Sequence, residues 1–197
     1  DWAALHGIGA FNVRIESSAD VDVLNSLLRR AHGMLDTRLY FTATLSPAFF
    51  AEGDDVGVDA KLTSIASLIG SNYWLHLDSR PVVVLEAAEK STSSASPSLF
   101  QVRALLPRVF LVLSCADPSH ALHATTESGS RVIDAFSPSK DVAHSVSAAK
   151  AFREKLNATP NLYLPRPQGL WSNSTFNGTF FNSTITSSAT FVNVSGV

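Results

Sequence analysis

The sequence predicts an α/β fold, an incomplete or divergent (β/α)8 TIM-barrel-like domain with a C-terminal β-rich, glycosylated segment. Three observations support this prediction. Apolar, β-branched runs alternate with stretches of helical periodicity along most of the chain. The expected strand starts are separated by roughly 20 to 45 residues, the spacing of βα units with variable loops. Six such units favour a barrel that lacks one strand at its start and one or more at its end, because a closed barrel has eight.

An open, doubly wound sheet is the alternative arrangement of the same elements. Such a sheet commonly binds a dinucleotide at a Gly-x-Gly-x-x-Gly turn that follows a strand. No expected strand is followed by this pattern, and Gly7-Ile8-Gly9 precedes a strand instead. The doubly wound fold stays open, but we expect no cofactor.

The first unit is a strand over residues 8–15 and an amphipathic helix that Gly33 ends. The candidate N-caps of this helix are Ser17, Ser18 and Asp20. Its apolar face consists of Val23, Leu24, Leu27, Leu28 and Ala31. The second unit is a strand over residues 38–45 and, after an acidic loop at 52–57, a helix that Gly70 closes. That helix carries an apolar face of Leu62, Ile65, Leu68 and Ile69.

A third unit contains the most apolar strand of the chain. An extended lead-in over residues 73–77 reaches a turn at Asp78-Ser79-Arg80-Pro81 and then the run 82–85, which is Val-Val-Val-Leu. Because this run has no polar side, both sides of the strand are expected to be covered. The later elements are a short helix (99–105), strands (109–113 and 132–136), a helix (141–156) and a strand (161–164).

Composition bounds the class of protein. With 197 residues, of which 45% are hydrophobic, the chain is long enough for one domain with an appendage. We place the domain at 1–170 and the appendage at 171–197. The net charge of −2 and the scattered Lys and Arg residues give no footprint for nucleic acid. No apolar stretch approaches the roughly 20 residues of a membrane span. The start at Asp1, without Met or a signal-like segment, suggests a processed or excised piece.

Cysteine and histidine offer little chemistry. Cys115 is the single cysteine, which excludes an intrachain disulfide and a cysteine-based zinc site. It continues an apolar strand, so an inert core thiol is favoured over a reactive one. His120 and His123 are three residues apart, but no third ligand is evident, and we expect no metal site.

The C-terminal region indicates the secretory route. Five triplets fit the N-glycosylation pattern, at Asn157, Asn173, Asn177, Asn182 and Asn193. The alternative is that a Ser/Thr/Asn-rich tail forms such triplets by chance, which explains one or two more easily than five. Asn157 is the weakest, because Pro160 directly follows its Thr159. We expect a secreted, extracellular or cell-surface protein that carries N-linked glycans.

The tail alternates polar and apolar residues without helix formers, which is typical of β-structure. A β-appendage, an edge hairpin and a segment that folds only against a partner are three open interpretations. Its apolar residues are Phe176, Phe180, Phe181 and Ile185. Left uncovered, these side chains would favour self-association through the tail.

Candidate catalytic acids follow from the expected strand ends, where α/β folds place their chemistry. These acids are Glu16, Glu86, Asp117 and Asp134, with Glu89 three residues after Glu86. Cleavage of a glycosidic bond needs two carboxyl groups roughly 5 to 9 Å apart, one as acid and one as base or nucleophile. Glu86 is the best single candidate, because it directly follows the most buried strand. Capping, loop or strand-end roles are the alternatives for the other three.

Aromatic side chains are candidates for stacking on a sugar ring. Tyr73 and Trp74 stand before the central strand, and Trp2, Tyr163 and Trp171 are scattered elsewhere. Core packing is the more common role of such residues.

The order of several motifs resembles the fungal α-1,3-glucanases of glycoside hydrolase family 71 and, similarly, family 99. The resemblance covers nearly all of 1–170 and rests on five short motifs: Ala4-Leu5-His6-Gly7-Ile8-Gly9-Ala10-Phe11-Asn12-Val13, Arg38-Leu39-Tyr40-Phe41-Thr42, Ser79-Arg80-Pro81-Val82-Val83, Val132-Ile133-Asp134-Ala135-Phe136-Ser137 and Leu162-Tyr163-Leu164-Pro165. The resemblance implies a (β/α) barrel and action on an α-glucan or another cell-wall polysaccharide.

The chain departs from this family at key positions. Arg14 stands where relatives carry an acid or amide, and we assign it to substrate binding instead. Thr44 stands where an Asp is common, and no segment matches the family's W-N-(D/E)-(Y/W)-G-E strand. Two functions therefore stay open: a secreted glycoside-hydrolase-like domain that acts on or binds polysaccharide, and a non-catalytic extracellular glycoprotein that serves as a wall, surface or assembly component.

Overall fold

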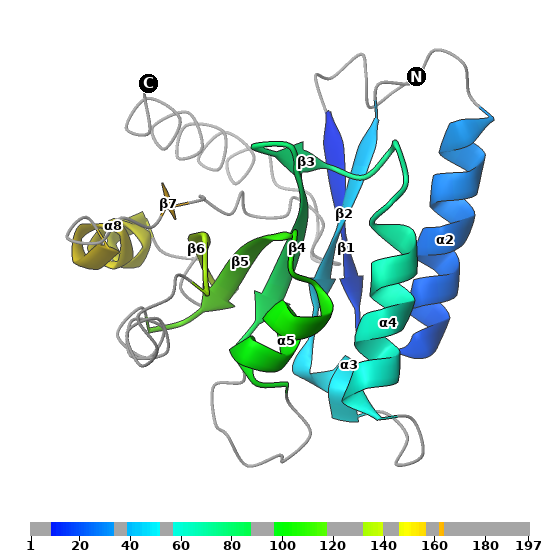
Figure 1. Ribbon diagram of the computed structural model, residues 1–197. Helices are drawn as coiled ribbons and strands as arrows, with labels where there is room; N and C mark the ends of the chain where they lie inside the picture. Colours follow the sequence, from blue (N-terminus) through cyan, green and yellow to red (C-terminus); the bar gives the residue numbers. More distant parts are fainter. Residues whose placement is uncertain are drawn as a thin grey trace, which may run out of the picture.

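The computed structural model describes residues 9–33, 39–51, 57–87, 97–117, 132–139, 146–156 and 162–163. Within them the chain forms an α/β structure around one mostly parallel sheet (Figure 1). The strands are β1 (Ala10–Ile15), β2 (Tyr40–Leu45), β3 (His76–Leu77), β4 (Arg80–Glu86), β5 (Phe110–Cys115), β6 (Ala135–Pro138) and β7 (Leu162–Tyr163). The helices are α2 (Ser18–His32), α3 (Pro47–Ala51), α4 (Val58–Leu68), α5 (Leu99–Leu105) and α8 (Val146–Leu156).

The strands of the sheet follow one another in chain order. The order is β1-β2-β4-β5-β6-β7, and every neighbouring pair is parallel. Within the described residues, only β3 is antiparallel, as the first arm of a hairpin with β4. A doubly wound sheet reverses its strand order in the middle, and no reversal occurs among the described strands. Sequential parallel neighbours are also the arrangement of (β/α) barrels; among the described strands, β1 and β7 lie at the two edges.

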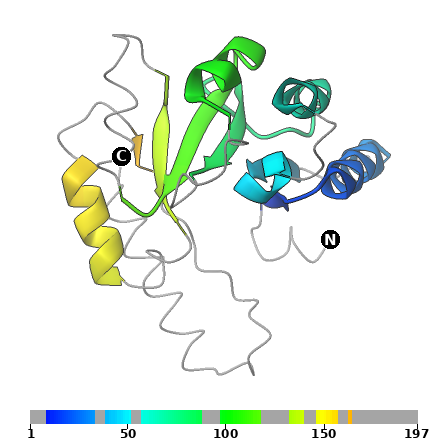
Figure 2. The ribbon, with the colours of Figure 1, turned by 90° about the horizontal axis from the view of Figure 1, so that it is seen from below.

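Helices cover one face of the sheet. In Figure 2, α2, α4 and α5 lie along one side of the strands, and α8 lies beyond β6. The core between these layers combines buried residues of alternating strand positions with the apolar stripes of the helices. On the strands these include Ile15, Ala43, Leu45, Val83, Leu85, Leu111 and Leu113, and on the helices Leu24, Leu28, Leu62, Ile65 and Val102. Burial of this apolar area is the main stabilising contribution of the fold.

The opposite face, which we call the polar face, is set by the alternation of side chains along each strand. Residues in register lie on the same face, so the registers assign to it Asn12, Arg14, Thr42, Thr44, Glu86, Ser114 and Ser137. A smaller apolar cluster of Val82, Phe110, Val112 and Ala135 completes it on β4, β5 and β6. On β4 to β6, the polar face is thus apolar toward the amino ends of the strands and polar toward their carboxyl ends.

The caps of α2 agree with the sequence prediction. Ser17 is the N-cap, and the Asp20 carboxylate accepts hydrogen bonds from the backbone N–H of Glu16 (2.9 Å) and Ser17 (2.8 Å). Gly33 is the C-cap, and its N–H donates to the carbonyl oxygen of Arg30 at 3.0 Å. These contacts satisfy backbone groups at both ends of the helix, which is why the local sequence was sufficient to place it.

Helix α3 was not predicted, because its signals are short-range caps rather than periodicity. The Ser46 hydroxyl accepts from the Ala48 N–H at 3.1 Å, and Pro47 occupies the first helical position, where its missing N–H costs nothing. At the other end, the buried Lys61 ammonium of α4 donates to the carbonyl oxygens of Phe49 (2.7 Å) and Phe50 (3.3 Å). A cation at a helix C-terminus is favourable.

The sixth strand begins later than predicted. A strand was expected over residues 132–136, but β6 spans Ala135–Pro138. The Asp134 carboxylate accepts from the Leu111 N–H at 2.9 Å, and the Asp134 N–H donates to the Leu111 carbonyl oxygen at 3.0 Å. A side chain thus takes one position of the ladder with β5, and regular pairing starts only after Asp134.

Several predictions fall outside the described residues. They include the whole segment 171–197 with its β-like alternation, the glycosylation acceptors, and the first part of the helix expected over 141–156. Among the residues that the structure describes, no helix is long and apolar enough to cross a membrane.

Candidate functional site

An ion-paired group lies at the carboxyl ends of β1 and β4, on the polar face. The Arg14 guanidinium contacts two carboxylates, Glu86 (Nη2 to Oε2, 2.9 Å) and Glu16 (Nε to Oε1, 3.2 Å). Strand β2 separates β1 from β4, so the Arg14 side chain reaches across it. The structure therefore brings together three residues that the sequence analysis selected separately.

The strand between them contributes a second polar contact. Asn12 Nδ2 donates to Thr44 Oγ1 at 2.7 Å, and Thr44 Oγ1 lies 3.0 Å from Asn12 Oδ1. Thr44 is in register with Arg14. The hydroxyl and the amide thus satisfy each other, and they form a neutral floor beside the charged residues. Their role was missed from the sequence, although alternation from Asn12 to Arg14 places both on one face.

The Arg14–Glu86 contact is close but poorly aligned. Glu86 Oε2 is buried and has no aligned hydrogen-bond partner, although the guanidinium nitrogen is 2.9 Å away. We describe the contact as an ion pair for that reason. Glu86 is only 13% exposed, whereas Arg14 is 43% and Glu16 54% exposed. The charged group is therefore reached from the side of Arg14 and Glu16.

Charge and spacing define what this group can do. One guanidinium stands against two carboxylates, so the three side chains carry −1 in their ionised forms. Glu16 Oε1 and Glu86 Oε2 each lie within 3.2 Å of a nitrogen of the same guanidinium, so their separation stays below the roughly 9.5 Å upper limit for the carboxyl pair of a glycosidase. Carboxylates accept hydrogen bonds from hydroxyl groups, and the guanidinium donates them. The group is suited to a neutral, hydroxyl-rich ligand more than to an anion.

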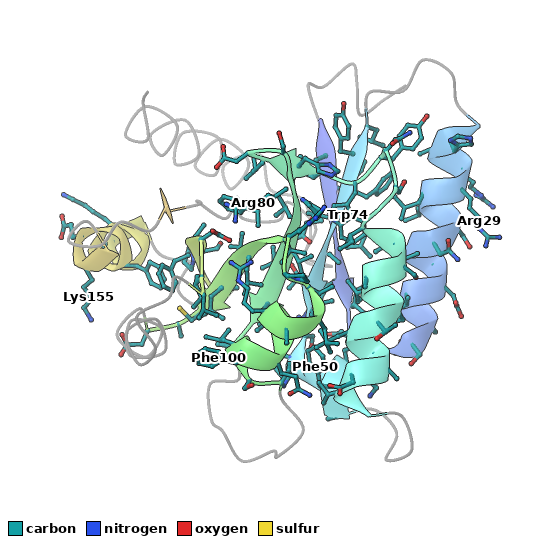
Figure 3. The ribbon with its side chains drawn as sticks, in the orientation of Figure 1. Arg29, Phe50, Trp74, Arg80, Phe100 and Lys155 are labelled. Carbon is teal, nitrogen blue, oxygen red and sulfur yellow. The ribbon has the colours of Figure 1, made fainter. Side chains whose placement is uncertain are left out.

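Asp134 lies at the other end of the sheet from Glu86. It precedes β6 and contacts β4 and β5 near their starts, where its Oδ1 pairs with Arg80 Nη1 at 3.0 Å and its Oδ2 with Arg103 Nη2 at 2.6 Å. Arg103 also donates to the carbonyl oxygens of Val132 (2.6 Å) and Val109 (2.7 Å). The Arg80 guanidinium lies over the Phe110 ring, 4.9 Å from its centroid (Figure 3 labels Arg80).

The electrostatics of Asp134 are those of a structural group. Burial acts to raise its pKa, but hydrogen bonds from the Leu111 N–H, Arg103 and Arg80 outweigh burial, and the pKa is lowered. A low pKa suits a permanent anion that holds two arginines in place. Because it sits at the amino ends of the strands, Asp134 does not form a carboxyl pair with Glu86.

The remaining acids are placed as follows. Asp117 follows β5 at the same end of the sheet as Glu86, and its Oδ1 lies 3.9 Å from the Lys155 ammonium of α8. Asp117 is about half exposed, and so is Lys155. Such a pair contributes little to stability. Glu89 lies outside the described residues.

The aromatic candidates lie at the amino ends of the strands. The segment from Tyr73 to Leu75 fits between β2 and β4, where Phe41 N–H donates to the Tyr73 carbonyl oxygen (2.8 Å) and Leu75 N–H to that of Phe41 (2.7 Å). Trp74, labelled in Figure 3, is fully buried, and its Nε1 donates to the Val82 carbonyl oxygen at 2.8 Å. Tyr73 packs edge-on against His32. The structure therefore does not bring these two rings to Glu86.

The structure says less about the remaining candidate residues. Trp2, Trp171, His120 and His123 lie outside the described residues, and for Tyr163 only the backbone of β7 is described. Cys115 is buried, and burial followed by the nearby Asp117 charge raises the pKa of its thiol to about 12. Such a thiol is inert at neutral pH. Among the described residues, no three His, Cys, Asp or Glu side chains gather as metal ligands would.

No family model matches the sequence, and no curated protein and no solved structure matches it. The resemblance to glycoside hydrolase families 71 and 99 thus rests on the quoted motifs alone.

Proposed function

We propose that this chain is a secreted glycoside-hydrolase-like domain that acts on or binds a polysaccharide at the carboxyl end of its sheet. The observation that supports the proposal most directly is the Arg14–Glu86 pair, which spans β2 on the polar face. Parallel sheets bind their ligands at this end of the strands. The sequential strand order is compatible with the incomplete (β/α) barrel that the motifs imply.

In this proposal the residues have distinct roles. Glu86 accepts hydrogen bonds from sugar hydroxyls and is the first candidate for a catalytic carboxyl group, and Glu16 is the second. Arg14 positions both, since its guanidinium contacts each of them. Asn12 and Thr44 form the neutral floor between the charged groups. The α-glucans implied by the resemblance are the first substrates to test.

A matched pair of substitutions tests the site. The full chain and its Glu86→Gln variant are compared for co-sedimentation with insoluble α-1,3-glucan and for release of reducing ends. We expect Glu86→Gln to lower binding about tenfold, the loss of one charge-assisted hydrogen bond, and to abolish any hydrolysis. Glu154→Gln on α8 is the control, because Glu154 is exposed and pairs only weakly with Lys150 at 3.9 Å. Binding and hydrolysis that survive unchanged in Glu86→Gln would show that Glu86 has no role.

A non-catalytic extracellular glycoprotein is the second candidate, and one observation favours it. Arg14 lies between the two candidate carboxylates, where a hydrolase would need to accommodate the scissile bond. Glucan binding without release of reducing ends, at every enzyme concentration tried, would select this candidate.

Secretion is tested separately from the site. Peptide-level mass spectrometry of the natural protein would read glycan occupancy at Asn157, Asn173, Asn177, Asn182 and Asn193. Occupied sites support the secretory route. Bare sites on protein isolated from its source would remove the argument for an extracellular location.

A further inference from the structure

Three buried polar atoms of the described residues have no hydrogen-bond partner, and all three lie at one end of the sheet. They are Glu86 Oε2, Ser114 Oγ and Ser139 Oγ. They come from three neighbouring strands: Glu86 ends β4, Ser114 is in β5, and Ser139 directly follows β6. Native proteins satisfy most buried polar groups, so a cluster of exceptions requires an explanation.

The registers place these residues on the same face. Glu86 is in register with Ser114, and Ser114 is in register with Ser137. Pairing with β5 continues one step past β6, because the Ser139 N–H donates to the Cys115 carbonyl oxygen at 2.8 Å. Strand alternation then puts Ser139 on the side of Ser137, which is the polar face.

Exposure is high at one end and low at the other end of the row formed by Arg14, Glu86, Ser114 and Ser139. The side chain of Arg14 is 43% exposed and that of Glu86 13%, whereas Ser114 is 1% and Ser139 6% exposed. The row is therefore open at Arg14 and closed at the two serines. A ligand group that enters past Arg14 meets Glu86 and then the serine hydroxyls.

The chemistry of the row selects a class of ligand. Glu86 only accepts hydrogen bonds, while each serine hydroxyl both donates and accepts. Arg14 offsets the charge of Glu86, and the second carboxylate on Arg14, that of Glu16, lies outside the row and is 54% exposed, so the row itself has no excess charge to attract an anion or a cation. Neutral hydroxyl groups satisfy all three atoms at once. An unsatisfied buried hydroxyl also carries a desolvation cost that a ligand would relieve.

We propose that Glu86, Ser114 and Ser139 form a subsite that binds the hydroxyl groups of one neutral sugar ring, with Arg14 at its entrance. This inference rests on the proposed polysaccharide ligand and adds which residues hold a ring and why that ring is uncharged. It assigns a binding role to two serines that sequence motifs do not mark.

The first test uses stability of the ligand-free protein. Ser114→Ala and Ser139→Ala each remove an unsatisfied hydroxyl, so we expect each to raise Tm, by roughly 2 to 4 °C. Ser46→Ala is the matched control, because Ser46 is equally buried but its hydroxyl accepts from Ala48 N–H. It should lower Tm by a similar amount. A fall in Tm for both Ser114→Ala and Ser139→Ala, as for the control, overturns the inference, because it means that buried water already satisfies the hydroxyls.

The second test uses binding. Wild type, Ser114→Ala and Ser139→Ala are titrated with glucose, glucosamine and glucuronate, with Tm as the readout, and assayed for co-sedimentation with α-1,3-glucan. We expect glucose to raise the Tm of wild type more than the two charged sugars do, and each substitution to weaken glucose and glucan binding about tenfold. Ser64→Ala is the binding control, since the Ser64 hydroxyl donates within α4 to the Lys61 carbonyl oxygen.

The outcomes separate this inference from the proposed function. Glucan binding that is unchanged in both serine variants overturns the subsite and leaves the proposed function standing. No glucan binding by wild type, together with a glucose response that Ser114→Ala abolishes, overturns the proposed function and supports the subsite. A stronger response to glucosamine or glucuronate than to glucose overturns the assignment of a neutral ring.

Discussion

The two ends of the sheet use the same residue types in opposite ways. At the amino end, the Asp134 carboxylate pairs with Arg80 and Arg103 and also accepts from the Leu111 N–H. At the carboxyl end, the Glu86 carboxylate meets Arg14 without an aligned hydrogen bond, next to a serine hydroxyl with no partner. Buried polar networks in which every group has a hydrogen-bond partner rigidify a structure. A buried polar group without a partner costs free energy, and ligand binding is one explanation for such a group. The amino end thus holds a satisfied ion-paired network that stabilises the fold, and the contrast agrees with our proposal that the carboxyl end binds a ligand.

The strongest test of this contrast removes the charge of one acid at each end of the sheet. We expect Asp134→Asn to lower the free energy of unfolding by about 3 kcal/mol or more, because it leaves two arginines without their buried anion. Glu86→Gln, the same change at the other end, should cost less than about 1 kcal/mol, because Arg14 is largely exposed and keeps Glu16. Urea unfolding midpoints compare the two. Equal losses would contradict the division between the ends.

Acid should also destabilise the amino end of the sheet, because it protonates Asp134. The pKa of Asp134 is lower in the folded protein than its ordinary value of 3.8, so the unfolded state binds more protons in this range. The contribution of Asp134 to stability is therefore fully present above about pH 5 and is lost as pH falls through 4 and below. Unfolding of wild type and Asp134→Asn between pH 3 and 7 checks this. The difference between them should shrink toward pH 3; a constant difference would show that the charge of Asp134 is not the cause.

The buried Trp74 indole stabilises the amino end of the sheet through one donated hydrogen bond. Trp74→Phe removes the hydrogen bond to the Val82 carbonyl oxygen and leaves a smaller ring in a fully buried position. We expect a loss of about 1 to 3 kcal/mol in thermal or urea unfolding, with glucan binding unchanged. Thr42→Ser is the control, since it keeps the hydroxyl that donates to the same oxygen at 2.6 Å. Reduced glucan affinity in Trp74→Phe would return this ring to the candidate site.

A substitution in the turn of the β3–β4 hairpin should have the smallest effect on the free energy of unfolding. Asp78 and Ser79 adopt φ values of 50° and 60°, where glycine is free of the strain that a side chain meets. Ser79→Gly should raise the free energy of unfolding by about 0.5 to 1 kcal/mol. Ser67→Gly is the opposite control, because Ser67 lies within α4, where glycine costs about 1 kcal/mol. Destabilisation by both changes would mean that flexibility of the unfolded chain outweighs the turn geometry.

Local signals predicted most of the described elements. The helix expected after Ser17 is α2, the short helix expected over 99–105 is α5, and the β-branched run 82–85 lies within β4. Each depends on a cap or a periodicity that neighbouring residues supply. Prediction failed where a residue distant in the sequence determines where an element begins or ends. The last turn of α3 is held by Lys61 from the following helix, and the start of β6 is delayed by the bond between Asp134 and Leu111.

The candidate site was partly accessible to the same reasoning. Glu86 and Glu16 were selected because each stands where an apolar strand ends, and both contact Arg14. Asp134 was selected by the same rule, yet it lies at the opposite end of the sheet, because the strand starts after it. Ser114 and Ser139 were missed, because a serine at the end of a strand has no distinctive sequence pattern. Only the absence of a hydrogen-bond partner for the hydroxyl group distinguishes these two.

Alternation, caps and chain spacing are local properties, so the α/β class, most helices and strands, and the acids that follow apolar runs could be predicted from the sequence. Which charges meet depends instead on how the strands are arranged in space. Arg14 and Glu86 meet because β1 and β4 both pair with β2, so that one long side chain spans the distance between them. Asp134 joins Arg80 and Arg103 because β5 and β6 align in register near it. Strand neighbours are chosen by long-range burial of the shared core, and no short segment of sequence encodes that choice.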